Sequence, residues 1–377
     1  MAKGTTSKTL LKGIQLVKKS FVLLYKTKAG ELPVLCNLFS GIISLCDYVL
    51  VRKRGNIFVE MEISSICNSR CIFCSYTSFS KNNKIRTLMS EETYEKVLEK
   101  LRQVKYDIIS FTPTTGDTLV NPDWDKYIQK TFSLDSVKTI IFYTNGILMN
   151  SLNIEKLIQL IRSDKQRKLF SLLFSLGGYD RETYLYMFGV DKFDLVRDNL
   201  RLLLTRLQQE KMSILVQLEF RIPRDYNLNL HSIKKDLNRP NYPFLGVRIL
   251  RDFSKIQKVP LDSGLSYLED TADKKRVCSY LFKTRFAADG GVWADGCVIS
   301  EFPGDTSLKL GTVDDDWNTL EQKRKKIVDN WEKKGIIPEP CKECSMYRSD
   351  KNPFPKGGVI PVWKKLYSGR ATSQKTK

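Results

Sequence analysis

The chain has 377 residues, of which 42% are hydrophobic and 28% charged, an ordinary balance for a soluble globular protein with one large domain and a smaller one. The formal net charge of +20 is unusually high, and most of it lies at the ends: ten Lys/Arg against two Asp/Glu in residues 1–54, and seven against one in residues 349–377. This distribution indicates terminal contacts with an acidic partner or an anionic membrane surface, or else solvated tails, rather than a basic active site. It argues against nucleic acid as a partner, because no aromatic platform is interleaved with the basic residues of one domain.

The cysteines and the N-terminal segment bear on the cellular compartment. Nine cysteines are clustered along the chain, and the Lys- and Thr-rich start predicts no cleavable signal peptide. This is typical of a reducing, cytoplasmic compartment, where clustered thiols bind metal or take part in catalysis. Residues 1–54 have a basic helical pattern, which predicts either a helix packed on the main domain or a peripheral membrane helix. Leu32–Val51 includes Asn37 and Asp47, so we expect a buried or interfacial helix rather than a membrane span.

From residue 55 to residue 270, apolar β-branched runs alternate with amphipathic helical stretches. Six alternations predict a parallel sheet with crossover helices, an α/β partial (β/α)6 barrel. Two clear helices are Ser90–Val104, with acidic residues in its first turns, and Asp191–Leu207. In such folds the chemistry lies at the C-terminal ends of the strands. The predicted strands are Ile57–Ile63, Ile108–Thr112, Thr139–Tyr143, Phe170–Ser175, Ile214–Arg221 and Gly246–Leu250.

The pattern changes again in residues 271–348, which we expect to form a small C-terminal α+β domain. Two short apolar runs, Thr284–Ala288 and Val292–Ile299, flank an Asp-Gly-Gly turn, which predicts a hairpin. A charged and mostly exposed helix, Trp317–Trp331, follows. The chain is therefore predicted to consist of a helical N-terminal extension, the barrel, this domain and the basic tail of residues 349–377.

Cys67, Cys71 and Cys74 directly follow the first predicted strand. Three thiolates within eight residues can hold one 4Fe–4S cubane, each binding a different iron. The fourth iron then has no protein ligand and is open to the amine and carboxylate of an amino acid. The alternative is a structural zinc site, which requires four ligands, whereas no fourth Cys or His lies nearby in the sequence.

This cysteine spacing, with an aromatic residue before the last thiol, resembles the cluster loop of the radical S-adenosylmethionine (SAM) superfamily. The resemblance covers residues 55 to about 348. It implies that Cys67, Cys71 and Cys74 hold a 4Fe–4S cluster and that S-adenosylmethionine binds at its open iron. It also implies that Phe73 lies against the adenine of the cofactor.

Three further turns, each at the end of a predicted strand, resemble cofactor-binding turns of that family. Thr115-Gly116-Asp117 is similar to the Gly-Gly-Glu-Pro stretch that holds the cofactor's ammonium, with Asp in place of Glu. Thr144-Asn145-Gly146 looks like the family's Thr-Asn-Gly turn. Ser175-Leu176-Gly177-Gly178 is similar to a Ser-x-Asp-Gly turn whose serine contacts the cofactor, although Gly177 stands where Asp is usual.

One family feature is missing. Met187-Phe188-Gly189 occupies the place where many relatives carry an Arg that pairs with the cofactor's carboxylate. Either Arg221, at the end of the fifth predicted strand, or Arg181 is left to substitute, and the alternative for both is a surface charge. The residues that the resemblance assigns to the cofactor are Phe73, Thr115, Gly116, Asp117, Asn145, Ser175 and Arg221.

A second cysteine group lies in the C-terminal region: Cys278, Cys297, Cys341 and Cys344. Four thiolates can fully ligate a second 4Fe–4S cluster, and zinc is the alternative for such a set. The order of single cysteine, hairpin cysteine, helix and Cys-x-x-Cys resembles the family's shortened auxiliary-cluster domain, called twitch, related to the longer SPASM domain. We interpret the remaining Cys36 and Cys46 as small buried apolar residues.

The resemblance implies that a reduced cluster cleaves S-adenosylmethionine and that the resulting 5′-deoxyadenosyl radical takes hydrogen from a substrate carbon. A fully ligated second cluster favours a role as electron acceptor, hence an oxidoreductase supplied by an external flavodoxin- or ferredoxin-type donor. The cysteine layout resembles the aminocyclitol alcohol dehydrogenase branch, and residues 1–54 are too short for a peptide-binding domain. We therefore expect a carbohydrate-like or lipid-linked substrate rather than a peptide. The alternatives are a peptide maturase or epimerase and, outside enzymes, a redox-sensing or structural metalloprotein on an anionic surface.

Overall fold

The computed structural model describes residue 20 and residues 58–74, 76, 86–104, 106–164, 168–237, 241–253, 264–267, 274–294, 305–345 and 347. The predicted N-terminal extension, except Ser20, and the basic tail lie outside the described residues, as do Cys36, Cys46 and Cys297. Within the described ranges, no helix is both long and apolar enough to span a bilayer.

A nine-stranded sheet forms the centre of the molecule, in the order β11-β10-β9-β1-β2-β3-β4-β5-β6. Strands β1 to β6 run parallel to their neighbours, and β6 ends the sheet, so the predicted partial barrel of parallel strands is confirmed and is open. Each strand lies within two residues of its predicted bounds. The strands are β1 (Phe58–Met61), β2 (Ile108–Phe111), β3 (Thr139–Thr144), β4 (Leu169–Leu176), β5 (Leu215–Arg221) and β6 (Leu245–Leu250).

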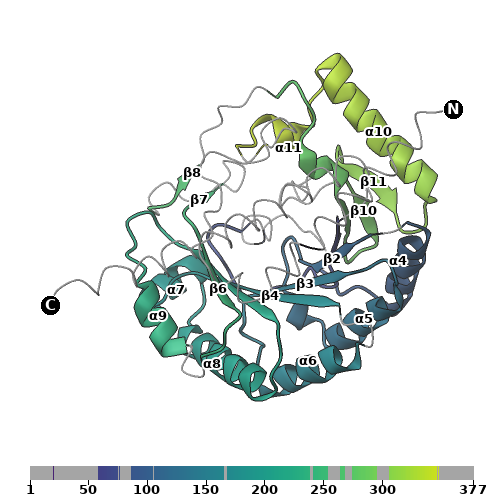
Figure 1. The fold of residues 1–377 in the computed structure, drawn as a ribbon. Helices are drawn as coiled ribbons and strands as arrows, with labels where there is room; N and C mark the ends of the chain where they lie inside the picture. Colours follow the sequence, from purple (N-terminus) through teal and green to yellow (C-terminus); the bar gives the residue numbers. More distant parts are fainter. Residues whose placement is uncertain are drawn as a thin grey trace.

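Helices connect these strands and cover the outer face of the curved sheet (Figure 1). The first begins as predicted, because the Ser90 side chain accepts a hydrogen bond from Thr93 N at 3.1 Å and acidic residues occupy the first turn. The helices are α4 (Glu91–Gln103), α5 (Trp124–Lys130), α6 (Ser151–Ser163), α7 (Arg181–Phe188), α8 (Phe193–Gln209) and α9 (Leu230–Leu237).

The two faces of the sheet carry different side chains. Along β5, the fully buried residues of the hydrophobic core are Val216, Leu218 and Phe220. Glu219, which lies between Leu218 and Phe220, and Arg221, which follows Phe220, point to the opposite, inner face. The register places Glu219 beside Arg248 of β6. Parallel sheets are normally apolar on both faces, so charged side chains on the inner face indicate that this face binds something polar.

Residues 274–345 continue the same sheet. Strand β9 (Thr284–Phe286) pairs in parallel with β1, and β10 (Gly291–Trp293) pairs antiparallel with β9, which confirms the predicted hairpin. Strand β11 (Lys309–Thr312) follows, and then α10 (Trp317–Lys334) and α11 (Glu339–Lys342). The Arg324 guanidinium, buried on α10, donates to Lys283 O at 2.9 Å and to Thr284 Oγ1 at 2.7 Å, which fixes this helix to β9. The domain boundary at residue 270 stays a prediction.

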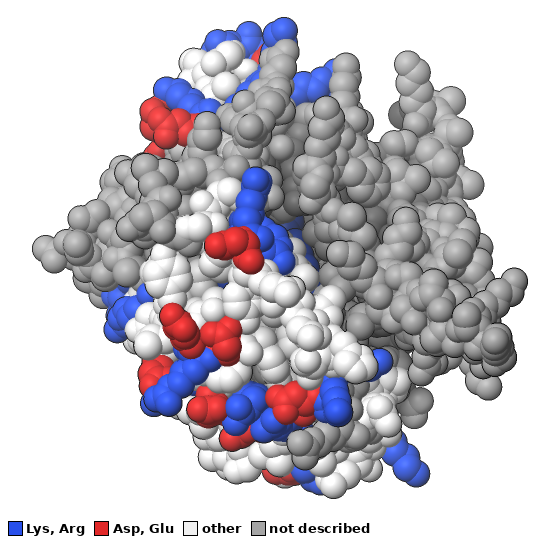
Figure 2. All heavy atoms as spheres, turned by 90° about the vertical axis from the view of Figure 1, so that its left-hand side faces the viewer, with Lys and Arg blue, Asp and Glu red and all other residues white. Residues whose placement is uncertain are grey.

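The described surface does not repeat the charge excess of the whole chain. Figure 2 shows acidic and basic side chains interspersed over the described part of one face. Along α8, for example, Arg197 pairs with Asp194 at 2.8 Å and Arg201 with Asp198 at 2.9 Å. Such exposed pairs contribute at most about 1 kcal/mol each, and they leave no single-sign patch on the described part of this face.

Candidate active site

The loop after β1 carries Cys67, Cys71 and Cys74 at the C-terminal edge of the sheet, as predicted. Burial, with smaller contributions from Asp117 and Cys74, raises the pKa of the Cys67 thiol to about 12. Burial, followed by Cys74, raises the pKa of Cys71 well above its ordinary value. The thiols therefore stay protonated unless a cation replaces their protons. Among the described residues, no three His, Cys, Asp or Glu side chains converge on a single metal ion, whereas a cubane requires each thiolate on a different iron.

The end of helix α7 anchors this loop through its backbone. Arg70 N donates to Phe188 O at 2.8 Å, and Ile72 N donates to Met187 O at 3.1 Å. Gly189 ends the helix in the left-handed region, at φ +65°, and a Cβ there would lie 2.5 Å from Arg70 O. The stretch that replaces the family's Arg is therefore where the cysteine loop attaches, a role that sequence reasoning missed.

The turn after β2 packs against the start of the same loop. A Cβ on Gly116 would lie 2.0 Å from Ser64 O and 3.0 Å from Ser65 Cα, so only glycine fits there. Its neighbour Thr115 is buried, and Thr115 Oγ1 accepts a hydrogen bond from the Arg86 guanidinium at 2.8 Å. The structure thus places Gly116 against the backbone at the start of the cysteine loop and Thr115 against Arg86.

Asp117 is 3% exposed and connects three segments. Its backbone N–H donates to Ile66 O at 2.9 Å. Its carboxylate accepts from Leu119 N at 3.0 Å, from Asn145 N at 2.7 Å and from Thr144 Oγ1, which lies 3.1 Å from both oxygens. Burial raises the pKa of Asp117 to about 6 although these hydrogen bonds oppose the rise. Each oxygen of the carboxylate thus has two hydrogen-bond contacts, which hold Asp117 between the turns after β2 and β3.

Asn145, at the end of β3, reaches the cysteine loop directly. Its Nδ2 donates to Asn68 Oδ1 at 2.7 Å and lies 3.9 Å from Cys67 Sγ. Its Oδ1 accepts from Ile147 N at 3.0 Å, which fixes the orientation of the amide. The turns after β2 and β3 and the cysteine loop therefore form one hydrogen-bonded unit.

Phe73 and Arg221 are neighbours in this unit. The Phe73 ring is 5% exposed and stacks on Phe253 at a centroid distance of 5.4 Å, with Phe188 edge-on at 5.8 Å. The Arg221 guanidinium lies 5.4 Å from the centre of the Phe73 ring and donates to Glu219 Oε1 at 2.7 Å. Arg221 thus lies beside the cysteine loop at the end of β5.

The other two predicted side chains lie in different surroundings. Arg181 pairs with Asp191 at the surface and is 66% exposed on its side chain, so Arg221 is the arginine that the fold brings to the loop. Ser175 lies at the end of β4, in register with Glu219. Glu219 also accepts from Arg248 Nη1 at 3.0 Å, so two guanidinium groups share one buried carboxylate.

Hydrogen-bond donors are in surplus around the loop. Among the described residues, the buried donor atoms without a hydrogen-bond partner include Asn68 Nδ2, Tyr184 Oη, Arg221 Nε and Arg248 Nε. A buried unmatched donor costs about 1–3 kcal/mol, and native proteins contain few of them. A surplus of donors beside three thiols fits an anionic, electron-rich ligand. A 4Fe–4S cluster with its sulfides, and the carboxylate of S-adenosylmethionine, are ligands of that kind.

A buried ion pair that sequence reasoning missed joins β1 to β9. Glu62 and Arg285 are 1% exposed each, and Arg285 Nη1 lies 3.4 Å from Glu62 Oε2. Thr114 completes the link, because its N–H donates to Glu62 Oε2 at 3.0 Å and its hydroxyl accepts from Arg285 at 2.8 Å. A charged residue within each of two predicted strands indicates that a partner is needed. The sequence does not predict which residues pair, because the two are 223 residues apart.

The second cysteine group is described in part. Cys278 and Cys341 are buried in one small hydrophobic cluster with Trp331. Cys344 is also buried, and its N–H donates to Cys341 O at 3.4 Å, which closes the Cys-x-x-Cys turn. The fourth predicted ligand, Cys297, lies outside the described residues. The second cluster therefore stays a prediction.

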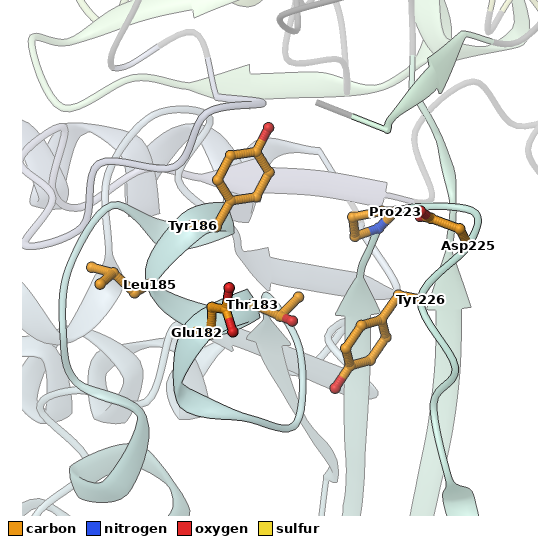
Figure 3. A pocket seen from close by; sticks show the side chains of 7 residues that line it. All are labelled: Glu182, Thr183, Leu185, Tyr186, Pro223, Asp225 and Tyr226. Carbon is orange, nitrogen blue, oxygen red and sulfur yellow. The ribbon is translucent and has the colours of Figure 1, made fainter. Parts of the chain in front are cut away.

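A pocket of about 510 Å³ opens between α7 and the segment after β5 (Figure 3). It uses a different side of α7 from the one that holds the cysteine loop. The Tyr226 hydroxyl, at its edge, donates to the Asp180 carboxylate and accepts from Tyr179 N at 3.0 Å, which fixes the segment after β5 to the start of α7. The lining residues are Glu182, Thr183, Leu185, Tyr186, Pro223, Asp225 and Tyr226.

Comparison with known proteins places this site in a family context. Residues 61–217 match the model of the radical SAM superfamily. Two curated relatives are GTP 3′,8-cyclases of Clostridium botulinum. The one from strain Okra / Type B1 is 26% identical over 119 residues, which are 32% of this chain and 35% of the relative. The one from strain Hall is 28% identical over 95 residues, 25% and 29% of the two chains. The chain thus spans about a third of the length of these relatives.

The solved structures that align with this chain have low sequence identity to it. The crystal structure of BtrN in complex with AdoMet and 2-DOIA is 14% identical, with a TM-score of 0.44 over 77% of this chain and 92% of that one. Native anSMEcpe with bound AdoMet is 15% identical, with a TM-score of 0.49 over 83% and 95% of the two chains.

Proposed function

Residues 61–217 of this chain belong to the radical SAM superfamily, and we propose that the protein cleaves S-adenosylmethionine on a 4Fe–4S cluster held by Cys67, Cys71 and Cys74. When bound, the cluster and the cofactor together supply an electron and a 5′-deoxyadenosyl radical that takes hydrogen from a substrate carbon. The surplus of buried donors around the three thiols carries this proposal. A structural zinc site requires four ligands, and the described residues offer no converging set.

The chain's own residues would position the cofactor. We assign the ammonium group to Asp117, the buried carboxylate that joins the turns after β2 and β3 to the cysteine loop. We assign the carboxylate to Arg221, whose Nε is a buried donor without a partner among the described residues. Phe73, beside Arg221, is assigned to the adenine side. Thr115, Asn145 and Ser175 lie at the ends of neighbouring strands and would complete the contacts.

For the net reaction we propose oxidation of a carbohydrate-like or lipid-linked alcohol. The carbon loses its hydrogen atom to the 5′-deoxyadenosyl radical, the hydroxyl loses its proton, and one further electron leaves, so that a carbonyl forms. A second cluster on Cys278, Cys297, Cys341 and Cys344 would supply the acceptor for that electron. The shared burial of Cys278 and Cys341 supports this ligand set, and the pairing of β9 with β1 supports its proximity to the barrel.

The test is anaerobic reconstitution with iron and sulfide, reduction, and measurement of 5′-deoxyadenosine released from S-adenosylmethionine. Release that depends on Cys71 supports the proposal. A protein that binds iron but releases no 5′-deoxyadenosine would instead be a redox-sensing or structural metalloprotein. Deuterium transfer from candidate substrates into 5′-deoxyadenosine then identifies the substrate class. Transfer from a peptide, or product without net oxidation, would favour a maturase or an epimerase over the alcohol oxidation.

A further inference from the structure

Tyr184 differs from four other buried tyrosines of the described residues. Its side chain is 0% exposed, and its hydroxyl has no hydrogen-bond partner. The hydroxyls of the following buried tyrosines all contact protein oxygen atoms: Tyr94, Tyr106, Tyr127 and Tyr242. Phenylalanine would fill the same space without a buried polar atom, so the hydroxyl requires an acceptor that the polypeptide does not supply.

The position of Tyr184 indicates where that acceptor lies. Its ring stacks on Phe188 at 5.0 Å, and the carbonyls of Met187 and Phe188 receive the backbone N–H groups of the cysteine loop. Tyr184 therefore belongs to the side of α7 that faces the loop, whereas Tyr186 belongs to the side that lines the pocket (Figure 3).

Electrostatics support this placement. After burial, the groups that raise the pKa of Tyr184 are Cys71, Asp117 and Cys67, so two of the three cluster cysteines act on the phenol. The rise keeps the hydroxyl protonated at physiological pH, and it remains a hydrogen-bond donor.

We infer that the Tyr184 hydroxyl donates a hydrogen bond to a sulfur atom of the cluster held by Cys67, Cys71 and Cys74. This inference rests on the proposed function, because it requires that cluster. A hydrogen bond to a cluster sulfur stabilises the reduced state, which carries more negative charge, and so raises the reduction potential. Tyr184 would thereby be a positioning residue that makes the cluster easier to reduce.

The test is Tyr184→Phe, which keeps the stacked ring and removes only the hydroxyl. The midpoint potential of the reconstituted cluster is measured by redox titration followed by electron paramagnetic resonance, without S-adenosylmethionine. Every protein in this comparison, including the one with Tyr184 intact, also carries Cys341→Ala. This substitution removes the signal of the proposed second cluster, so that the titration reports the first cluster alone. We expect Tyr184→Phe to shift the potential negative by about 60 mV, equivalent to a tenfold change in the one-electron equilibrium. The apo-protein should melt no lower than wild type, because no hydrogen bond is lost.

The matched control is Tyr186→Phe, on the same helix, whose side chain is 45% exposed; its potential should equal that of the wild type. If Tyr184→Phe loads poorly, Tyr184→3,5-difluorotyrosine, a stronger donor of similar shape, should shift the potential positive. An unchanged potential at full iron loading, or an equal shift in Tyr186→Phe, overturns the inference and leaves the proposed function standing. A Tyr184-intact protein with no 4Fe–4S signal refutes the proposed function and the inference with it.

Discussion

The buried Asp117 carboxyl should lower the stability of the apo-protein as pH rises. Its pKa is raised from 3.8 to about 6 in the fold. The native state therefore binds this proton more tightly than the unfolded state, so the contribution of Asp117 to stability is greatest at low pH and falls as pH rises through about 6. From these two values, the wild type should lose about 1.4 kcal/mol between pH 5 and pH 7.5 relative to a variant that cannot ionise at this position.

Asp117→Asn is that variant. The amide accepts fewer hydrogen bonds from Leu119 N, Thr144 Oγ1 and Asn145 N, which lowers stability by a roughly pH-independent amount of about 1–3 kcal/mol. Only the slope with pH reports the titration. Urea unfolding of the anaerobic apo-proteins at several pH values between 5 and 7.5, followed by tryptophan fluorescence, measures both slopes. Two parallel stability curves would show that Asp117 does not carry this shift, and the reasoning from its burial would be wrong.

Four further variants test cluster loading, cofactor binding and substrate oxidation. Gly116→Ala should prevent cluster loading, because its Cβ would lie 2.0 Å from Ser64 O; iron content close to that of the wild type would contradict the close approach. Asp117→Ala should weaken S-adenosylmethionine binding about tenfold to hundredfold at unchanged iron content, and equal affinity in calorimetry would leave Asp117 only a structural role. Cys71→Ala should lower iron from about eight to about four atoms per chain and abolish 5′-deoxyadenosine formation, whereas Cys341→Ala should spare that formation and stop substrate oxidation; product at the normal ratio would make the second site structural.

The sequence predicts the parts of this molecule that depend on local pattern. Runs of apolar residues located all six parallel strands, and the position of Ser90 before an acidic turn located the first helix of the barrel. The cysteine loop and the Gly116 turn were recognised because their residue types are constrained by chemistry and by space. In each case the signal lies within a few consecutive residues.

The parts that the sequence did not predict depend on partners far apart in the chain. The contacts of α7 with the cysteine loop are made by backbone carbonyls of Met187 and Phe188, which leave no side-chain signature. The pair between Glu62 and Arg285, which are 223 residues apart, depends on the pairing of β9 with β1. The unmatched hydroxyl of Tyr184 is a property of its surroundings and not of its type.

These separate features have a common physical cause. Burial raises the pKa values of Cys67 and Asp117, and the Asp117 carboxylate adds to the rise at Cys67, so both groups favour their protonated forms. The unmatched donors on Asn68, Tyr184 and Arg221 reflect polar atoms that are buried without an anion. Iron would supply the missing positive charge, while sulfide and a cofactor carboxylate would supply the missing acceptors. A zinc ion would relieve only the first deficit, because it brings charge to the thiols and no acceptor to the donors. The donor surplus therefore distinguishes the two ligands where the cysteine count alone does not.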